Sequence, residues 1–126
     1  MPNHVFSSTV LAHLRTATAQ PLDAAAFAAV FGQWEGEGGQ ARYMRNLEQF
    51  DERFTEEFEP LLGSIRVPVR IVWGERDAWL DPAIARRLLA LIPGAELSLI
   101  PGGGHFSMLD RPDEVARELA MFFGSA

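Results

Sequence analysis

Two polar residues on glycine-containing turns are placed to carry acid–base chemistry in this sequence. Asp77 ends the turn 74–77 (GERD), and His105 directly follows the glycine run 102–104. A carboxylate beside an imidazole fixes the tautomer of the ring and stabilises its protonated form, which a general base needs when it takes a proton from a serine or a water. The glycine run lets the backbone turn sharply. Asp77 and His105 are therefore the candidate catalytic residues.

The elements around these turns predict that the two side chains meet. The segment Val67–Trp73 is short, β-branched and apolar, which is typical of a buried strand, and Ala95–Ile100 is predicted to be a second strand. Between them a helix is expected to begin with Asp81 as N-cap and Pro82 in the first helical position, and a last helix is expected near Pro112. Strands joined in this way are parallel, and ligands bind outside their carboxyl ends. Both turns leave carboxyl ends, so both candidates belong at one edge of the sheet.

The beginning of the chain has a different character, with helical patterns and no convincing strand. Asp23 is placed to cap a short helix, Gly36–Gly39 predicts a loop, and the charged segment Asp51–Glu59 predicts a solvated helix face. We therefore divide the chain into a helical segment, 1–64, and an α/β segment, 65–126. Two parallel strands make a smaller sheet than parallel sheets usually form, which suggests that strands are missing.

Composition limits the classes of partner and cofactor. The formal net charge of −6 argues against a general phosphate-binding surface, so no nucleic-acid partner is expected. The absence of cysteine excludes disulfides, thiolate metal sites and cysteine nucleophiles, and the spacing of His4 and His13 is not that of metal ligands. Neither a signal peptide nor an apolar run of roughly 18 residues is recognisable. We expect a cytoplasmic protein without a metal, an organic cofactor or membrane contact.

The α/β segment resembles the C-terminal part of the α/β-hydrolase fold family. The resemblance is strong over residues 60–124, in IRVPVRIVWGERDAWLDP and IPGAELSLIPGGGHFSMLDRPDEVARELAMFF. In that family the triad acid follows a late strand in a G-x-x-D turn, and the histidine follows the last strand in a G-H turn. The resemblance implies that Asp77 orients the base His105 during water-dependent cleavage of an ester, carbon–carbon or carbon–halogen bond in a small molecule. Residues 1–60 resemble the helical cap that many members insert before these strands.

The sequence departs from the family pattern at the nucleophile. None of the six serines lies in a G-x-S-x-G elbow, no aspartate lies in the equivalent turn, and an HGGG-type oxyanion loop is absent. By the family pattern, about five strands would precede Met1. We expect a partial α/β-hydrolase fold that is inactive alone, and that pairs with the missing N-terminal half or self-associates through its exposed strand edge. The alternatives are a non-catalytic binding or assembly module and a truncated gene product.

Other residues near the two turns have competing interpretations. Glu75 and Asp81 are rival acids, although Asp81 is better explained as a helix cap. Trp79 and Phe106 are candidates for the wall of a substrate pocket and equally for packing beside the strand ends. Asp110 has no expected part in turnover, so Asp110→Asn should cost little.

Overall fold

A computed structural model describes residues 2–124 of the chain. The helices are α1 (Asn3–Leu14), α2 (Ala24–Phe31), α3 (Gly39–Glu48), α4 (Arg53–Glu56), α5 (Ala83–Leu91), α6 (Ser107–Asp110) and α7 (Pro112–Gly124), the 3-10 turns are η1 (Arg15–Ala17), η2 (Gly32–Trp34) and η3 (Glu59–Ser64), and the strands are β1 (Arg70–Gly74) and β2 (Glu96–Ile100). Of these described helices, none combines the length and the hydrophobicity that crossing a membrane requires.

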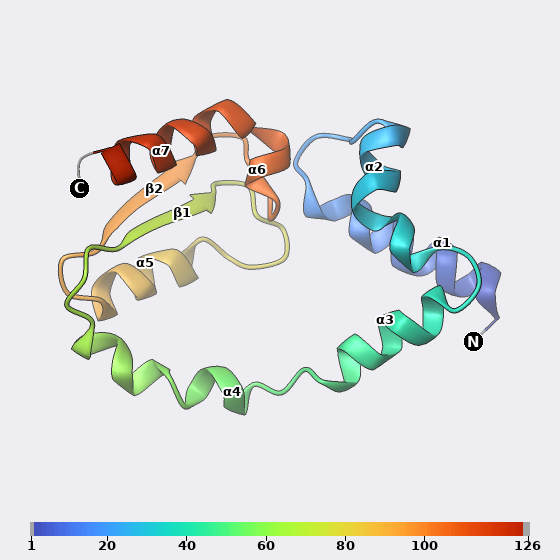
Figure 1. Cartoon of the computed structure of the whole chain (residues 1–126), viewed down its shortest axis with the longest axis horizontal. Coiled ribbons are helices and arrows are strands. Elements are labelled where there is room, and N and C mark those ends of the chain that lie inside the picture. The colour runs from blue at the N-terminus through green and yellow to red at the C-terminus, as the bar shows by residue number, and fades with distance from the viewer. Residues whose placement is uncertain (1, 125–126) are drawn as a thin grey trace.

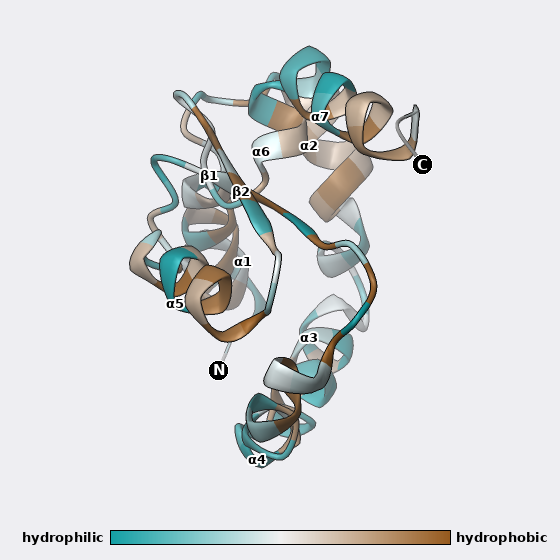
Figure 2. Ribbon diagram, turned by 90° about the vertical axis from the view of Figure 1, so that its left-hand side faces the viewer, coloured by the Kyte–Doolittle hydropathy of each residue, from teal (hydrophilic) through white to brown (hydrophobic). Residues whose placement is uncertain are grey.

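The two strands form a parallel sheet that helices cover on both faces. Arg70 pairs with Glu96 at one end of the register, and Gly74 pairs with Ile100 at the other. Helices α5 and α7 lie on opposite sides of the strands (Figures 1 and 2), and both helices contact both strands. Ile71 and Ile100 are buried in this layer. The predicted α/β class, with helices followed by a βαβα unit with two parallel strands, is confirmed.

The first strand begins three residues later than the sequence predicts. Val67 is 68% exposed, and pairing starts only at Arg70. Pro68 between them has no N–H to donate to a strand ladder, which favours a strand start beyond it. The helix after β1 begins one residue later than expected, at Ala83, so Pro82 and not Asp81 occupies the N-cap position. The Asp81 carboxylate still accepts a hydrogen bond from the N–H of Ala83 at 2.8 Å.

The helical segment builds its own core and extends it to the α/β segment. Asp23 caps α2 by accepting from the Ala26 N–H at 2.8 Å, as predicted. A cluster of buried residues then packs between α1 and α2, and Trp79 and Phe106 from the later loops pack against it. The buried members are Leu14, Ala17, Phe27 and Phe31. The main core of the described residues therefore joins both segments.

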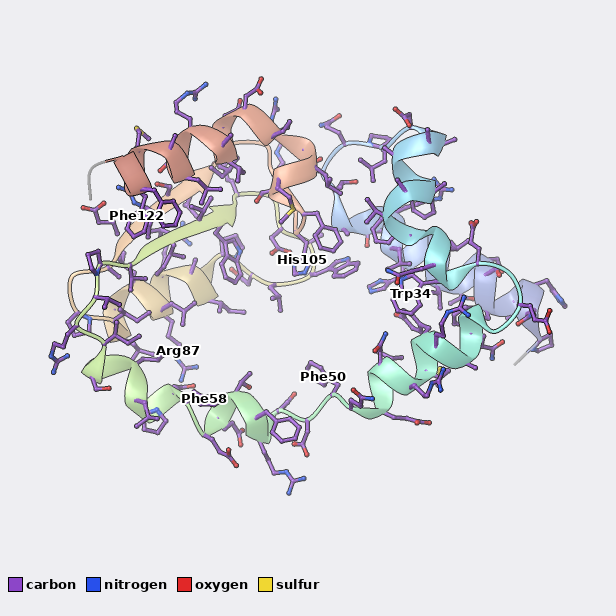
Figure 3. The ribbon with its side chains drawn as sticks, viewed as in Figure 1. Trp34, Phe50, Phe58, Arg87, His105 and Phe122 are labelled. Atoms are coloured by element: carbon purple, nitrogen blue, oxygen red, sulfur yellow. The ribbon has the colours of Figure 1, made fainter. Side chains whose placement is uncertain are left out.

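The charged stretch after α3 runs as a single layer along one side of the molecule (Figure 1). The predicted helix over residues 51–59 is only the single turn α4, followed by η3. These elements connect α3 to β1 on the side of the molecule opposite α2 and α6 (Figure 1). Phe50, 78% exposed, and Phe58, also exposed, lie on this stretch (Figure 3), which is largely hydrophilic around them (Figure 2). Large apolar side chains here lack a covering layer within the described chain.

A half-buried ion pair fastens the last helix to both strands. Arg70 on β1 donates to Glu118 on α7 at 2.9 Å and to the Ser98 hydroxyl on β2 at 3.1 Å. The Ser98 hydroxyl donates to the same Glu118 oxygen at 2.6 Å. Because the Arg70 and Glu118 side chains are only 22% and 20% exposed, their interaction is less screened than that of a surface pair.

Replacing Glu118 with glutamine should therefore weaken the fold. The amide oxygen is neutral and binds both donors more weakly than a carboxylate, so Glu118→Gln is expected to lower the free energy of unfolding by about 1–3 kcal/mol, measured by urea denaturation. Glu37→Gln, at an exposed position before α3, is the matched control and should change stability by less than about 0.5 kcal/mol. Equal stability of the two variants would contradict the role given to the ion pair.

Candidate active site

Asp77 lies in the turn after β1 with its carboxylate almost fully enclosed. The side chain is 4% exposed. One carboxylate oxygen, Oδ1, accepts from the backbone N–H groups of Trp79 and Leu80, each at 2.9 Å. The other oxygen, Oδ2, lies 3.0 Å from Nδ1 of His105. The local turn thus holds one oxygen and aims the other at the imidazole.

The surroundings of Asp77 favour its ionised form. Burial raises the pKa of this carboxyl, but hydrogen bonds from the Leu80 N–H, from His105 and from the Trp79 N–H outweigh burial, and the pKa is lowered overall. The carboxylate therefore carries a full charge next to His105 at neutral pH, which is the state that stabilises a protonated ring.

His105 is held by this carboxylate in a single tautomer. An ionised carboxylate can only accept hydrogen bonds, so Nδ1 must carry the hydrogen that is shared with Asp77. In the neutral ring Nε2 is then the free proton acceptor. The His105 side chain remains 25% exposed, and it lies between the strand ends and the N-terminal helices (Figure 3). The ring is thus fixed at one nitrogen and available at the other.

Close backbone packing brings the two turns together. A Cβ atom at Gly74 would lie 2.0 Å from the carbonyl oxygen of Gly104, so no side chain fits there. The N–H of Arg76 donates to the Gly103 carbonyl at 2.8 Å, and the N–H of Glu75 donates to the Ile100 carbonyl at 3.1 Å. The first glycine of the G-x-x-D turn is required because the histidine turn crosses directly over it.

The rival acids lie in other contacts. The Glu75 carboxylate faces the N–H of Gly102 at 3.4 Å, and the Asp81 carboxylate accepts from the N–H of Ala83 at the start of α5. Neither carboxylate is within ion-pair distance of His105, whereas Asp77 is. The structure therefore brings Asp77, and not its neighbours, to the ring.

Trp79 and Phe106 flank the imidazole and also pack on the helical core. The Trp79 ring centroid is 4.8 Å from that of His105, and the Phe106 centroid is 5.3 Å from it. Trp79 also borders a surface hollow together with Ala78, Leu80 and His105. Trp79 is thus both a packing residue and part of the surface beside the imidazole, while Phe106 packs toward Phe31.

His13 belongs to this region, which its position in α1 did not indicate. Its ring stacks on Trp79 with centroids 4.5 Å apart and planes within 5°, and it lines the same hollow. The indole N–H of Trp79 donates to the Thr16 hydroxyl at 2.8 Å, which fixes the indole between the two imidazoles. Among residues 2–124 no cluster of three possible metal ligands is found.

Asp110 is a second anchor, half-buried, that the sequence did not reveal. Its carboxylate accepts three backbone N–H groups, from Ala19 at 2.8 Å, Gln20 at 2.9 Å and Gly104 at 2.7 Å. Two of these partners lie about 90 positions earlier in the chain. No local sequence pattern could show this contact, and the expectation that Asp110→Asn costs little turnover did not take it into account.

The lowered pKa of Asp77 predicts a specific dependence of stability on pH. A carboxyl whose pKa is depressed by folding stabilises the fold above the pKa of the unfolded chain, and this contribution is lost as the pH falls through the folded-state pKa. Asp77→Asn should flatten the decline of unfolding free energy below about pH 4 and lower stability at pH 7 by about 1–3 kcal/mol. Urea denaturation across this pH range measures both effects. If Asp77→Asn left the loss of stability below about pH 4 unchanged, the lowered pKa of Asp77 would be contradicted.

Comparison with known proteins identifies the family. Residues 2–118 match the family model described as the alpha/beta hydrolase family. A 2-hydroxy-6-oxononadienedioate/2-hydroxy-6-oxononatrienedioate hydrolase of Klebsiella pneumoniae is 32% identical over 84 residues, which make up 67% of this chain and 29% of that protein. Monoacylglycerol lipase ABHD6 of Bos taurus is 30% identical over 79 residues, which make up 63% of this chain and 23% of the lipase.

Solved structures show the same partial correspondence. An alpha/beta hydrolase fold protein from Burkholderia ambifaria superimposes with a TM-score of 0.87 and 29% identity, over 94% of this chain and 44% of its own. The match includes the helices as well as the βαβα unit, so their mutual arrangement is that found in a larger alpha/beta hydrolase fold protein. This chain spans less than half of that protein and under a third of the two curated relatives. The chain belongs to the alpha/beta hydrolase family.

Proposed function

We propose that this chain supplies the acid and the histidine of a hydrolase active site. The observation that carries the proposal is the 3.0 Å contact between Asp77 and His105, on turns that leave the carboxyl ends of two paired parallel strands. His105 acts as the general base, and Asp77 orients the ring and stabilises its positive charge. The relatives' names, a hydrolase and a lipase, support hydrolysis of a small molecule as the reaction.

The proposed proton transfers follow from the tautomer. Nε2 of His105 takes the proton of an attacking hydroxyl or water, whose oxygen forms the new bond to the substrate. The ring then carries a proton on each nitrogen, and its charge lies against the Asp77 carboxylate. Nε2 returns its proton to the leaving group as the old bond breaks. The scissile bond is an ester, carbon–carbon or carbon–halogen bond, and Trp79 and Phe106 form part of the pocket wall.

The proposed site is completed by further polypeptide. The sequence holds no nucleophile elbow, and the Burkholderia ambifaria protein has more than half of its chain outside the matched region. In the described residues β1 pairs with β2 alone, so its other edge is open to another strand. We propose that strands carrying the nucleophile dock along β1, at the side of the sheet from which Asp77 emerges.

Activity should appear only when these strands are supplied. The chain alone is expected to hydrolyse activated esters no faster than His105→Ala, because it lacks a nucleophile and oxyanion hole. When it is joined to or co-expressed with a polypeptide that carries the remaining strands and a G-x-S-x-G or G-x-D-x-G elbow, turnover should appear. In that assembly His105→Ala should reduce kcat by about 10³-fold or more, and Asp77→Asn should also cost heavily.

Asp81→Asn is the matched control for Asp77→Asn. The amide oxygen of asparagine can accept the same bond from the Ala83 N–H, so this variant should keep α5 and most of the turnover. Loss of activity in Asp81→Asn with tolerance of Asp77→Asn would refute the choice of acid. Saturable, His105-dependent hydrolysis by the chain alone would refute the incomplete site.

The open strand edge also predicts behaviour in solution. Because β1 is unpaired on one side and Phe50 and Phe58 are exposed, the isolated chain is expected to self-associate in sedimentation experiments. Adding the completing polypeptide should replace these species with one stoichiometric complex. A sharp monomer with cooperative unfolding would instead favour a self-sufficient binding module.

A further inference from the structure

The backbone on both sides of His105 is tied to one short segment of the helical half. The N–H of Gly104 shares the Oδ2 oxygen of Asp110 with the N–H of Ala19. The N–H of Phe106 donates to the carbonyl of Ala17 at 2.8 Å. The residues before and after the imidazole therefore both depend on where the segment Ala17–Gln20 lies.

The contact between the histidine turn and the segment Ala17–Gln20 leaves no room for a side chain at Gly104. A Cβ atom at Gly104 would lie 2.7 Å from the Ala19 nitrogen and 3.0 Å from the Ala17 oxygen. The glycine thus serves the approach of the helical segment as well as the turn itself. Ala17 is fully buried at this junction, so the segment cannot shift without opening the core.

The chemistry of the junction requires a carboxylate at position 110. Three N–H donors converge on two oxygens, with Ala19 and Gly104 on Oδ2 and Gln20 on Oδ1. Hydrogen bonds from N–H groups to an ionised carboxylate are stronger than neutral ones. An asparagine has one acceptor oxygen, so its NH₂ group would face at least one N–H donor. Asp110 therefore cannot be replaced by its nearest isostere without losing a bond.

We propose that Asp110 is a positioning residue that latches the segment Ala17–Gln20 to the histidine turn and thereby keeps Nδ1 of His105 on Asp77. The inference rests on the proposed function, because it gives the helical half a part in aligning the base. Asp110 touches no reacting atom and acts only through the backbone on either side of the imidazole. Displacement of the helical segment would release the ring from its orienting acid.

The test measures the tautomer of the His105 imidazole by nuclear magnetic resonance in the 126-residue chain. The ¹⁵N chemical shifts of the His105 ring report which nitrogen carries the hydrogen. Asp110→Asn is expected to change the ring from the Nδ1–H tautomer to a mixture of both, and to speed hydrogen exchange of the Ala19, Gln20 and Gly104 amides by about tenfold or more. Asp113→Asn, at an exposed position three residues later, should change neither.

Two further measurements decide the proposal if Asp110→Asn does not fold. In the unchanged protein the three amides should open together, with protection factors that agree within about threefold, because they share one acceptor group. Asp110→Glu retains the charge but lengthens the side chain, and it should shift the tautomer in the same direction. Unprotected Ala19 and Gln20 amides, or a folded Asp110→Asn with the wild-type tautomer, would overturn the latch.

These outcomes are separable from those of the proposed function. A completed enzyme whose turnover depends on His105, together with a tautomer insensitive to Asp110→Asn, would keep the function and remove the latch. A tautomer that responds to Asp110→Asn in an assembly that shows no His105-dependent hydrolysis would keep the latch and remove the function.

Discussion

The approach of the histidine turn over Gly74 is the constraint from which the rest of the site follows. With a carbonyl oxygen 2.0 Å from where its Cβ would be, this position admits only glycine. The parallel register brings Gly74 and Ile100 side by side at the strand ends, so the two turns that follow them must cross. Their backbones then hydrogen-bond directly, as Arg76 does to Gly103. This backbone contact between the two turns brings Asp77 within 3.0 Å of His105.

The energetic cost of this arrangement is concentrated at Asp77. Enclosing a carboxylate is expensive unless its oxygens are fully engaged. Here two backbone N–H groups and one imidazole nitrogen engage them, and the lowered pKa shows that these bonds outweigh the loss of water. A carboxylate that stays charged in an enclosed position can orient an imidazole and stabilise its protonated form. The remaining contact with water is made by His105, whose side chain is 25% exposed.

The helical half is integrated with the site and does not merely shield it. Its buried cluster includes Ala17 and receives Trp79 and Phe106 from the two turns. Asp110 then joins Ala19 and Gln20 to the same turn that carries the imidazole. In the proposed latch, a movement of the helical segment would therefore change the orientation of His105. The exposed stretch from Phe50 to Phe58 makes no comparable contact with the site.

The sequence by itself determined the local elements and the two turns. Asp23, Asp81 and the glycines around Asp77 and His105 act within a few positions of themselves, and their roles follow from backbone geometry. Only the tertiary structure decided which of three nearby acids reaches the ring, because that choice depends on how the turn aims each carboxylate once β1 and β2 pair. It alone revealed the part of Asp110, since donors about 90 positions away leave no local pattern. It also placed the start of β1 at Arg70, beyond Pro68, which has no N–H to donate to a strand ladder.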